Sequence, residues 1–327
     1  MAESLAPIFH GGFLRPASFT GVPPTAPAPG NRTGSATVAC RRPQRAGEDA
    51  VTNLAIRVMT AAVLVPLVVW GVLALPTGAF GLGLALFVVA GAWEWADLAG
   101  YPVAGRAAYA AGVAAILAGA QALIPDPAFT LAVLGLAMLW WLVALLWVLR
   151  YQTGRSFPGL DNMAVRAALG ILVLVPAWTA MTLLHGAGGR GPAWVMLILV
   201  IVWGADTGAY FAGRRFGRHR LASRVSPGKT VEGVAGGLLA AGAISGSFAW
   251  WWLDAVDAVA PLIALGIATA LAAVLGDLAE SLIKRCAGRK DSGVLIPGHG
   301  GVLDRIDSLT AAAPVFVAGL AIQDMVS

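Results

Sequence analysis

Long apolar runs follow one another along most of this chain, and they restrict its fold more than any other feature. Nine runs are predicted to be helical, near residues 54–75, 79–99, 107–124, 130–149, 166–184, 193–212, 234–253, 261–283 and 308–325. A helix of about 20 residues crosses the roughly 30 Å of hydrocarbon in a bilayer. Irregular backbone cannot face lipid, and the runs lack the alternation of a transmembrane barrel. The sequence therefore predicts an all-α fold, a polytopic transmembrane helical bundle of about nine helices.

The composition excludes a soluble globular domain, because 58% of the residues are hydrophobic and only 12% are charged. Two cysteines, Cys40 and Cys286, are too few for a disulfide framework or a zinc site. The sequence contains neither a GxxxxGK[ST] phosphate loop nor a serine nucleophile elbow. Any chemistry must therefore be sought among the few charged residues of the apolar region.

Residues 1–52 have a different character, since prolines interrupt a mixture of Gly, Ala, Ser and Thr with scattered Arg. Such a segment buries too little apolar surface to offset the entropy of ordering, so disorder is predicted. A cytosolic tail is favoured over a transit peptide. Residues 53–327 are predicted to form one membrane-embedded domain, with Asn53 as the N-cap of the first helix.

Basic residues are distributed unevenly between the connectors of the predicted helices. With the N-terminus in the cytoplasm, the cytoplasmic connectors hold Arg106, Arg150, Arg155 and the clusters at 214–229 and 284–305. The opposite connectors hold Arg190 as their one basic residue. This matches the positive-inside rule and places both basic clusters in the cytoplasm. Eight spans, which would leave the C-terminal tail inside, are the alternative.

Several acids lie unusually close to apolar runs. Asp277, Glu280, Ser281 and Lys284 are spaced to share one face of a helix. Charge inside a span is costly, so these residues suggest either a metal site beside a phosphate or an ion pair that locks two helices. Glu94, between two tryptophans, suggests equally a polar cavity or the headgroup level.

The segment from Ser281 to Asp307 concentrates five basic residues, three aspartates and five glycines. Asp304 and Asp307 suit the start of the last helix, where carboxylates favour the helix dipole. Alternatively, their oxygens complete a hard-cation site with Asp277, and the nearby glycines bring backbone N–H groups to phosphate oxygens.

An earlier loop carries similar chemistry. Between Thr207 and Gly233 it holds a basic patch, in which Lys229 is flanked by the hydroxyl donors Ser226 and Thr230. Phosphate binding is one interpretation of this patch. Topogenic charge and attraction to anionic lipid are the other.

The 27 residues from Ser281 to Asp307 resemble the signature of the phosphatidate cytidylyltransferase (CDP-diglyceride synthase) family. The matching positions are Ser281, Lys284, Arg285, Lys290, Asp291, Gly293, Ile296, Pro297, His299, Gly300, Gly301, Asp304, Arg305 and Asp307. The segments DTGAYFAG and SPGKTVEG, which begin at Asp206 and Ser226, are also similar to the family. Gly228 departs from it, because a basic residue more often precedes the lysine there.

The resemblance implies transfer of a cytidylyl group from CTP to phosphatidate, giving CDP-diacylglycerol and pyrophosphate. It also implies a cytoplasmic metal centre with Mg²⁺, a second metal ion being left open. Asp277, Asp304 and Lys284 are the predicted catalytic residues, and Asp277, Asp304 and Asp307 the predicted metal ligands. The predicted substrate-binding residues are Arg285, Lys290, Asp291, His299, Arg305, Ser226, Lys229 and Thr230.

Two other functions remain as alternatives, a CTP- or ATP-dependent membrane lipid kinase and a transporter of an anionic solute. A kinase would release a nucleoside diphosphate in place of pyrophosphate. A transporter would place its acids near the bilayer midplane in paired halves, and no internal repeat is visible. The expected partners are CTP, phosphatidate and membrane lipids, with no nucleic acid and with a homodimer left open. A bacterial inner membrane is the expected location.

Overall fold

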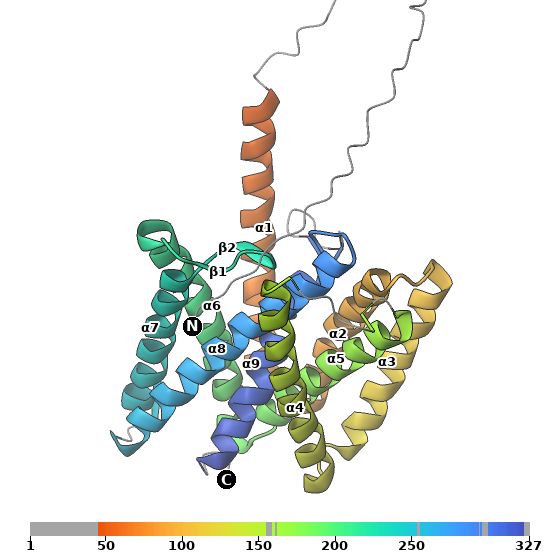
Figure 1. The fold of residues 1–327 in the computed structure, drawn as a ribbon. Coiled ribbons are helices and arrows are strands. Elements are labelled where there is room, and N and C mark those ends of the chain that lie inside the picture. The colour runs from red at the N-terminus through yellow and green to blue at the C-terminus, as the bar shows by residue number, and fades with distance from the viewer. Residues whose placement is uncertain are drawn as a thin grey trace, which may run out of the picture. The chain divides into compact units, whose positions relative to one another are not determined.

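The computed structural model describes residues 45–154, 159–160, 162–253, 256–293, 295 and 300–323, and the side chains from Val58 onward. The described residues form nine α-helices (Figure 1). Their bounds are α1 Arg45–Ala74, α2 Thr77–Ala99, α3 Val103–Leu123, α4 Pro127–Gln152, α5 Met163–His185, α6 Gly191–Phe216, α7 Val231–Phe248, α8 Val256–Cys286 and α9 Leu303–Ile322. Short helical turns cover Gly188–Arg190 and Ala249–Leu253.

Eight of these helical segments are long and apolar enough to cross a membrane, and the described apolar part of α1, Val58–Ala74, is shorter. The predicted all-α transmembrane bundle is therefore confirmed. The start of α1 differs from the prediction. It begins at Arg45, so Asn53 lies inside a helix and is not its N-cap. Residues 1–44 lie outside the described residues, and the disorder predicted for them stays a prediction.

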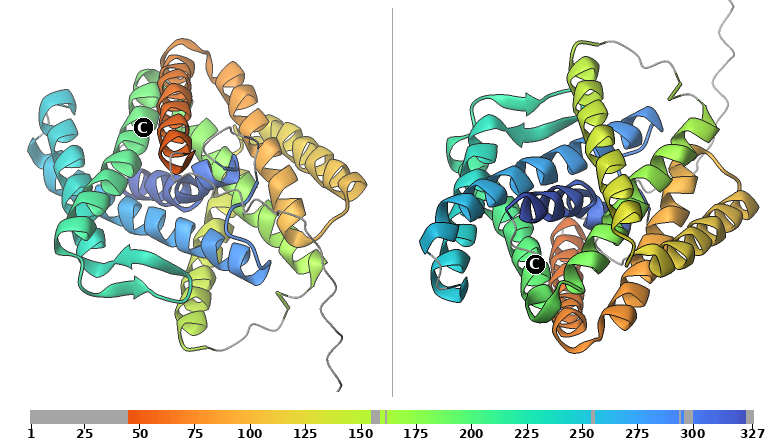
Figure 2. Two further views of the ribbon diagram at one scale, coloured as in Figure 1. Left: turned by 90° about the horizontal axis from the view of Figure 1, so that it is seen from above. Right: turned by 90° about the horizontal axis from the view of Figure 1, so that it is seen from below.

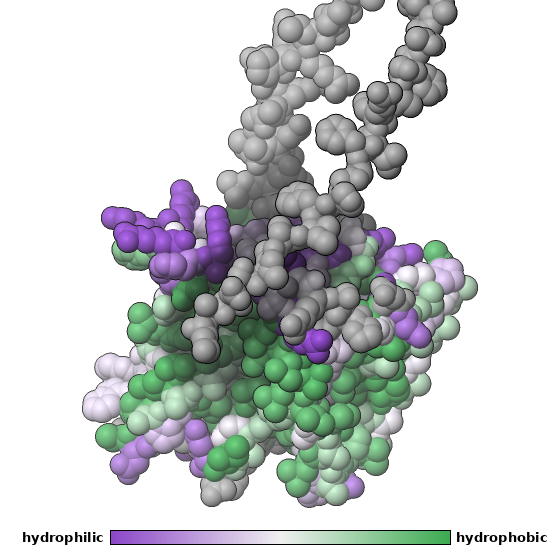
Figure 3. Space-filling view, viewed as in Figure 1, coloured by the Kyte–Doolittle hydropathy of each residue, from purple (hydrophilic) through white to green (hydrophobic). Residues whose placement is uncertain are grey.

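The core of the bundle lies around α5 and α9. α9 packs against α5 and α8, and α8 in turn packs against α7, with α9 near the middle of the bundle (Figure 2). Trp178 of α5 and Phe316 of α9 are among the largest fully buried side chains. α4, by contrast, exposes leucines, among them Leu139 and Leu142. Hydrophobic side chains accordingly cover most of the visible side of the bundle, and hydrophilic ones gather near β1 and β2 (Figure 3).

A two-stranded hairpin between α6 and α7 was not predicted. β1 (Arg220–Ala222) and β2 (Ser226–Thr230) are antiparallel, and Ala222 is opposite Ser226. At the turn, Val225 is fully buried, and the Arg224 backbone N–H donates to Oε1 of Gln152 at the end of α4 (3.2 Å). The hairpin therefore reaches from the start of α7 to the end of α4. β1 has only three residues, and β2 contains Pro and Gly, which in a sequence indicate a loop.

Candidate active site

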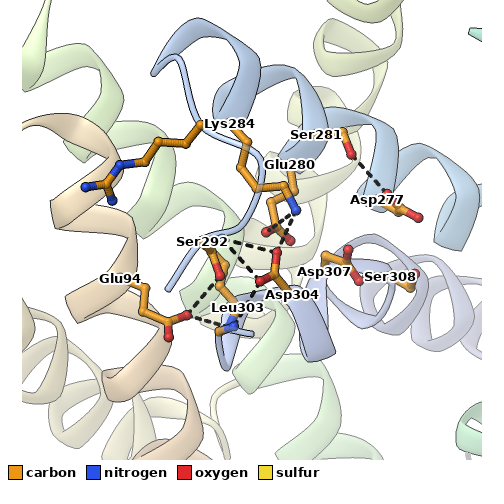
Figure 4. Close-up of polar contacts among 12 residues, drawn as sticks. Glu94, Asp277, Glu280, Ser281, Lys284, Ser292, Leu303, Asp304, Asp307 and Ser308 are labelled. Carbon is orange, nitrogen blue, oxygen red and sulfur yellow. Dashed lines mark hydrogen bonds and ion pairs between the residues drawn. The ribbon is translucent and has the colours of Figure 1, made fainter. Parts of the chain in front are cut away.

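Lys284 occupies the centre of a group of carboxylates between α8 and α9. Its Nζ lies 2.6 Å from Oδ1 of Asp304 and 3.1 Å from Oε1 of Glu280 (Figure 4). Lys284 and Glu280 are one helical turn apart on α8, and both are buried. The predicted catalytic lysine therefore holds two acids together across a helix interface. Asp277, Glu280, Asp304 and Asp307 are called the carboxylate cluster below.

Asp304, interpreted from the sequence as an N-cap, is instead the second residue of α9, two residues beyond the cap position at Val302. Its carboxylate accepts hydrogen bonds from the backbone N–H groups of Gly301 (2.9 Å) and Ser292 (3.1 Å). Gly300 has φ = 83°, a left-handed conformation that favours glycine, and it turns the chain into α9. Asp304 therefore fastens the preceding loop to the first turn of the helix.

Asp277 contacts the hairpin. Its Oδ2 lies 2.6 Å from Nζ of Lys229 on β2, and its Oδ1 accepts a hydrogen bond from the Ser281 hydroxyl (3.2 Å). Beside it, Gly276 allows α8 and α9 to touch, because a Cβ there would lie 2.5 Å from the backbone oxygen of Asp307. Asp307 therefore lies next to the Asp277 turn of α8, while Asp304 lies next to Lys284 (Figure 4).

A cavity of about 510 Å³ opens beside the Lys229–Asp277 pair, between α6, the hairpin, α7 and α8. Basic side chains line one part of it, namely Arg214, Arg218, Arg220 and Lys229. Small or apolar residues of α6, α7 and α8 line the other part, among them Ala209, Leu238 and Ala273. Asp206 lines the cavity as well. It can therefore take a ligand with an anionic head and an apolar body.

The other predicted substrate-binding residues are spread over the same end of the bundle. The Arg285 guanidinium donates to the backbone oxygens of Val225 and Arg289 (both 3.3 Å), so it ties the hairpin to the loop after α8. Lys290, Asp291 and Arg305 are exposed.

Thr230 caps α7 by accepting from the Gly233 N–H (3.1 Å) and lines the cavity, whereas Ser226 is half-buried in β2. His299 lies outside the described residues.

Two residues of the site were not predicted. Glu94 of α2 is only 3% exposed, and its carboxylate accepts from the Ser292 hydroxyl (3.1 Å) and from the N–H groups of Val302 (3.1 Å) and Leu303 (2.9 Å). Glu94 therefore binds the start of α9, which neither of its two sequence interpretations anticipated. In the sequence, the one signal for a role of Glu94 was its position inside an apolar helix. The sequence gives no comparable signal for Ser292.

The residues of the carboxylate cluster suit a hard divalent cation. Within the described chain, no three Asp, Glu, His or Cys side chains converge as ready-made metal ligands. Mg²⁺ nevertheless needs only one or two carboxylates, because it keeps waters and binds substrate phosphates. Four carboxyl groups here meet two ammonium groups, and Lys284 is the one cationic partner of the Glu280 carboxylate among the described residues. Carboxyl groups therefore outnumber the ammonium groups beside them, so oxygen ligands remain for an added cation.

Comparisons with known proteins identify the family of this chain. A family model described as the cytidylyltransferase family matches residues 55–323. A phosphatidate cytidylyltransferase of Pseudomonas aeruginosa is 46% identical over 267 residues, which are 80% of this chain and 95% of the relative. Proteins of the same name from Haemophilus influenzae and Brucella suis are 42% and 34% identical, over 55% and 80% of this chain and 65% and 92% of their own lengths. The chain therefore belongs to the cytidylyltransferase family.

Proposed function

We propose that this protein is a phosphatidate cytidylyltransferase, which converts CTP and phosphatidate into CDP-diacylglycerol and pyrophosphate. The observation that carries the proposal is the contact between Lys229 and Asp277 at the wall of a basic cavity. It brings the two conspicuous sequence segments, the hairpin loop and the α8–α9 segment, to one place. The names of the relatives from Pseudomonas aeruginosa and Brucella suis support the same activity independently of the geometry.

The cavity has a place for each substrate. Arg214, Arg218, Arg220 and Lys229 supply positive charge for the triphosphate of CTP, and arginines can bind phosphate oxygens in pairs. The small and apolar residues of α6, α7 and α8 accept the glycerol and the first part of the acyl chains. The remainder of the lipid stays in the bilayer.

The reaction joins two anions. A phosphate oxygen of phosphatidate forms a bond to the α-phosphorus of CTP, while the bond from that phosphorus to the bridging oxygen breaks and pyrophosphate leaves. The attacking phosphate is already ionised near neutral pH, so the reaction needs no strong general base. The cationic side chains reduce the repulsion between the substrates and stabilise the charge that grows on the leaving group.

Asp277, Asp304 and Asp307 are the residues that would hold Mg²⁺, as hard oxygen ligands in a cluster where carboxyl groups outnumber ammonium groups. When bound, Mg²⁺ neutralises phosphate charge and orients the phosphates. Lys284 keeps Asp304 in place through their 2.6 Å contact, and Lys229 does the same for Asp277.

The cavity and both basic clusters are assigned to the cytoplasmic side, where CTP is present. The N-terminus then also lies in the cytoplasm, and the host membrane is a bacterial inner membrane. The positive-inside distribution of Lys and Arg supports this orientation.

A single assay tests the function. The purified protein is supplied with labelled CTP, phosphatidate and Mg²⁺ in mixed micelles, and both products are identified. CDP-diacylglycerol and pyrophosphate in equal amounts are expected. Absence of CDP-diacylglycerol would contradict the proposed function. Release of CDP with a phosphorylated lipid when diacylglycerol replaces phosphatidate would establish a CTP-dependent lipid kinase instead.

A further inference from the structure

Glu94 lies on α2, far from the Ser281–Asp307 segment in the sequence, yet its carboxylate binds the first residues of α9. Gly100 ends α2 in the left-handed conformation (φ = 98°), so Glu94 and Asp97 fall in its last two turns on one face. Both residues contact the loop between α8 and α9. Asp97 is ion-paired with Arg289 near the start of that loop, and Glu94 binds its end.

The start of α9 has no cap of its own. Val302, at the cap position, has a helical conformation and no side-chain cap. The N–H groups of Val302 and Leu303 donate to Glu94 instead, so a carboxylate from another helix satisfies them and interacts with the positive end of the helix dipole. A buried charge is retained only where such partners satisfy it.

Ser292 links Glu94 to the carboxylate cluster. Its hydroxyl donates to Glu94 Oε2 (3.1 Å), and its backbone N–H donates to Asp304 Oδ2 (3.1 Å). The packing around Glu94 is tight as well, because a Cβ at Gly293 or Gly301 would lie 2.4 Å from a Glu94 carboxylate oxygen. These two glycines are therefore required by the close approach of Glu94.

We infer that Glu94 is a positioning residue of the active site, which acts through Ser292 and the first turn of α9 to hold Asp304 and Asp307 opposite α8. This inference rests on the proposed function. It assigns a catalytic consequence to a residue outside both signature segments, without contact to the substrates.

The test uses the full-length protein with Glu94→Gln, which retains one acceptor oxygen and the side-chain volume but loses the charge. The control is Thr179→Val, which removes a fully buried hydrogen bond (Thr179 hydroxyl to Val175 oxygen, 2.9 Å) in α5. Both variants are assayed well below their melting temperatures. Misplacement of reacting groups by about 1 Å costs roughly 10²-fold in rate, so we expect Glu94→Gln to lower kcat by about that factor. Thr179→Val is expected to keep the wild-type kcat.

Hydrogen exchange supplies a readout that does not depend on catalysis. The amides of Val302 and Leu303 are expected to exchange faster in Glu94→Gln than in the wild type and in Thr179→Val. If Glu94→Gln fails to fold, Ser292→Ala is measured in its place. A smaller loss of kcat is then expected, because only the hydrogen bond from the Ser292 hydroxyl to Glu94 is removed. Equal kcat values for Glu94→Gln and Thr179→Val, or unchanged exchange at residues 302 and 303, would overturn the inference. Failure of the proposed function is distinguishable, since it would appear as absent wild-type turnover with the exchange result intact.

Discussion

Lys284 gives the sharpest prediction about the energetics of the site. Lys284→Met keeps the aliphatic stem but removes the cation between Glu280 and Asp304, whose Oε1 and Oδ1 atoms lie 3.1 Å and 2.6 Å from Nζ. Removing one partner of a buried ion pair costs about 3–5 kcal/mol, because the other charge stays buried and uncompensated. We therefore expect the free energy of unfolding to fall by about that amount.

The structure also predicts which acid causes most of this loss. Without Lys284, Asp304 retains the N–H donors of Ser292 and Gly301, whereas Glu280 retains no hydrogen-bond donor among the described residues. Adding Glu280→Gln to Lys284→Met should therefore recover stability, with a coupling energy of about 1–3 kcal/mol.

The measurement is a double-mutant cycle of unfolding in mixed micelles, followed by tryptophan fluorescence. Ile283→Met is the matched control, since this neighbouring buried side chain changes shape without changing charge, and a loss below about 1.5 kcal/mol is expected. A double variant less stable than Lys284→Met alone, or strict additivity, would refute the reasoning.

Three further predictions concern activity and packing. Asp277→Ala and Asp304→Ala should each lower CDP-diacylglycerol formation by roughly 10²–10³-fold while the protein still inserts into the membrane, and retained turnover in either variant would remove that residue from the metal site. Lys229→Ala should raise the KM for CTP about tenfold, which corresponds to a loss of about 1.4 kcal/mol of binding, whereas Arg190→Ala at an exposed position outside the cavity should leave the KM unchanged. An unchanged KM in Lys229→Ala would exclude a contact between Lys229 and the CTP phosphates. Gly276→Leu should lower the melting temperature and the activity together, because a Cβ there already lies 2.5 Å from a backbone oxygen of α9, and a variant with wild-type values for both would contradict that close contact.

The prediction from sequence was strongest for the helices and weakest for the contacts between them. All nine predicted runs correspond to helices. A long apolar segment in lipid must form all its backbone hydrogen bonds internally, and a helix does so. The Glu280–Lys284 pair could also be anticipated, since the two residues are four positions apart on one helix. The hairpin was missed because both strands are short and β2 contains Pro and Gly, which are typical of turns.

The sequence by itself determined that this protein is a membrane bundle and that its basic residues gather in two segments, because hydrophobic length and charge position act locally along the chain. Only the tertiary structure decided which charges meet. Lys229 reaches Asp277 through the hairpin, and Glu94 binds Ser292 at a separation of 198 residues. No periodicity encodes such contacts. They arise where buried carboxylates and helix-end N–H groups, which cannot remain unpaired in an apolar interior, find each other as the helices pack.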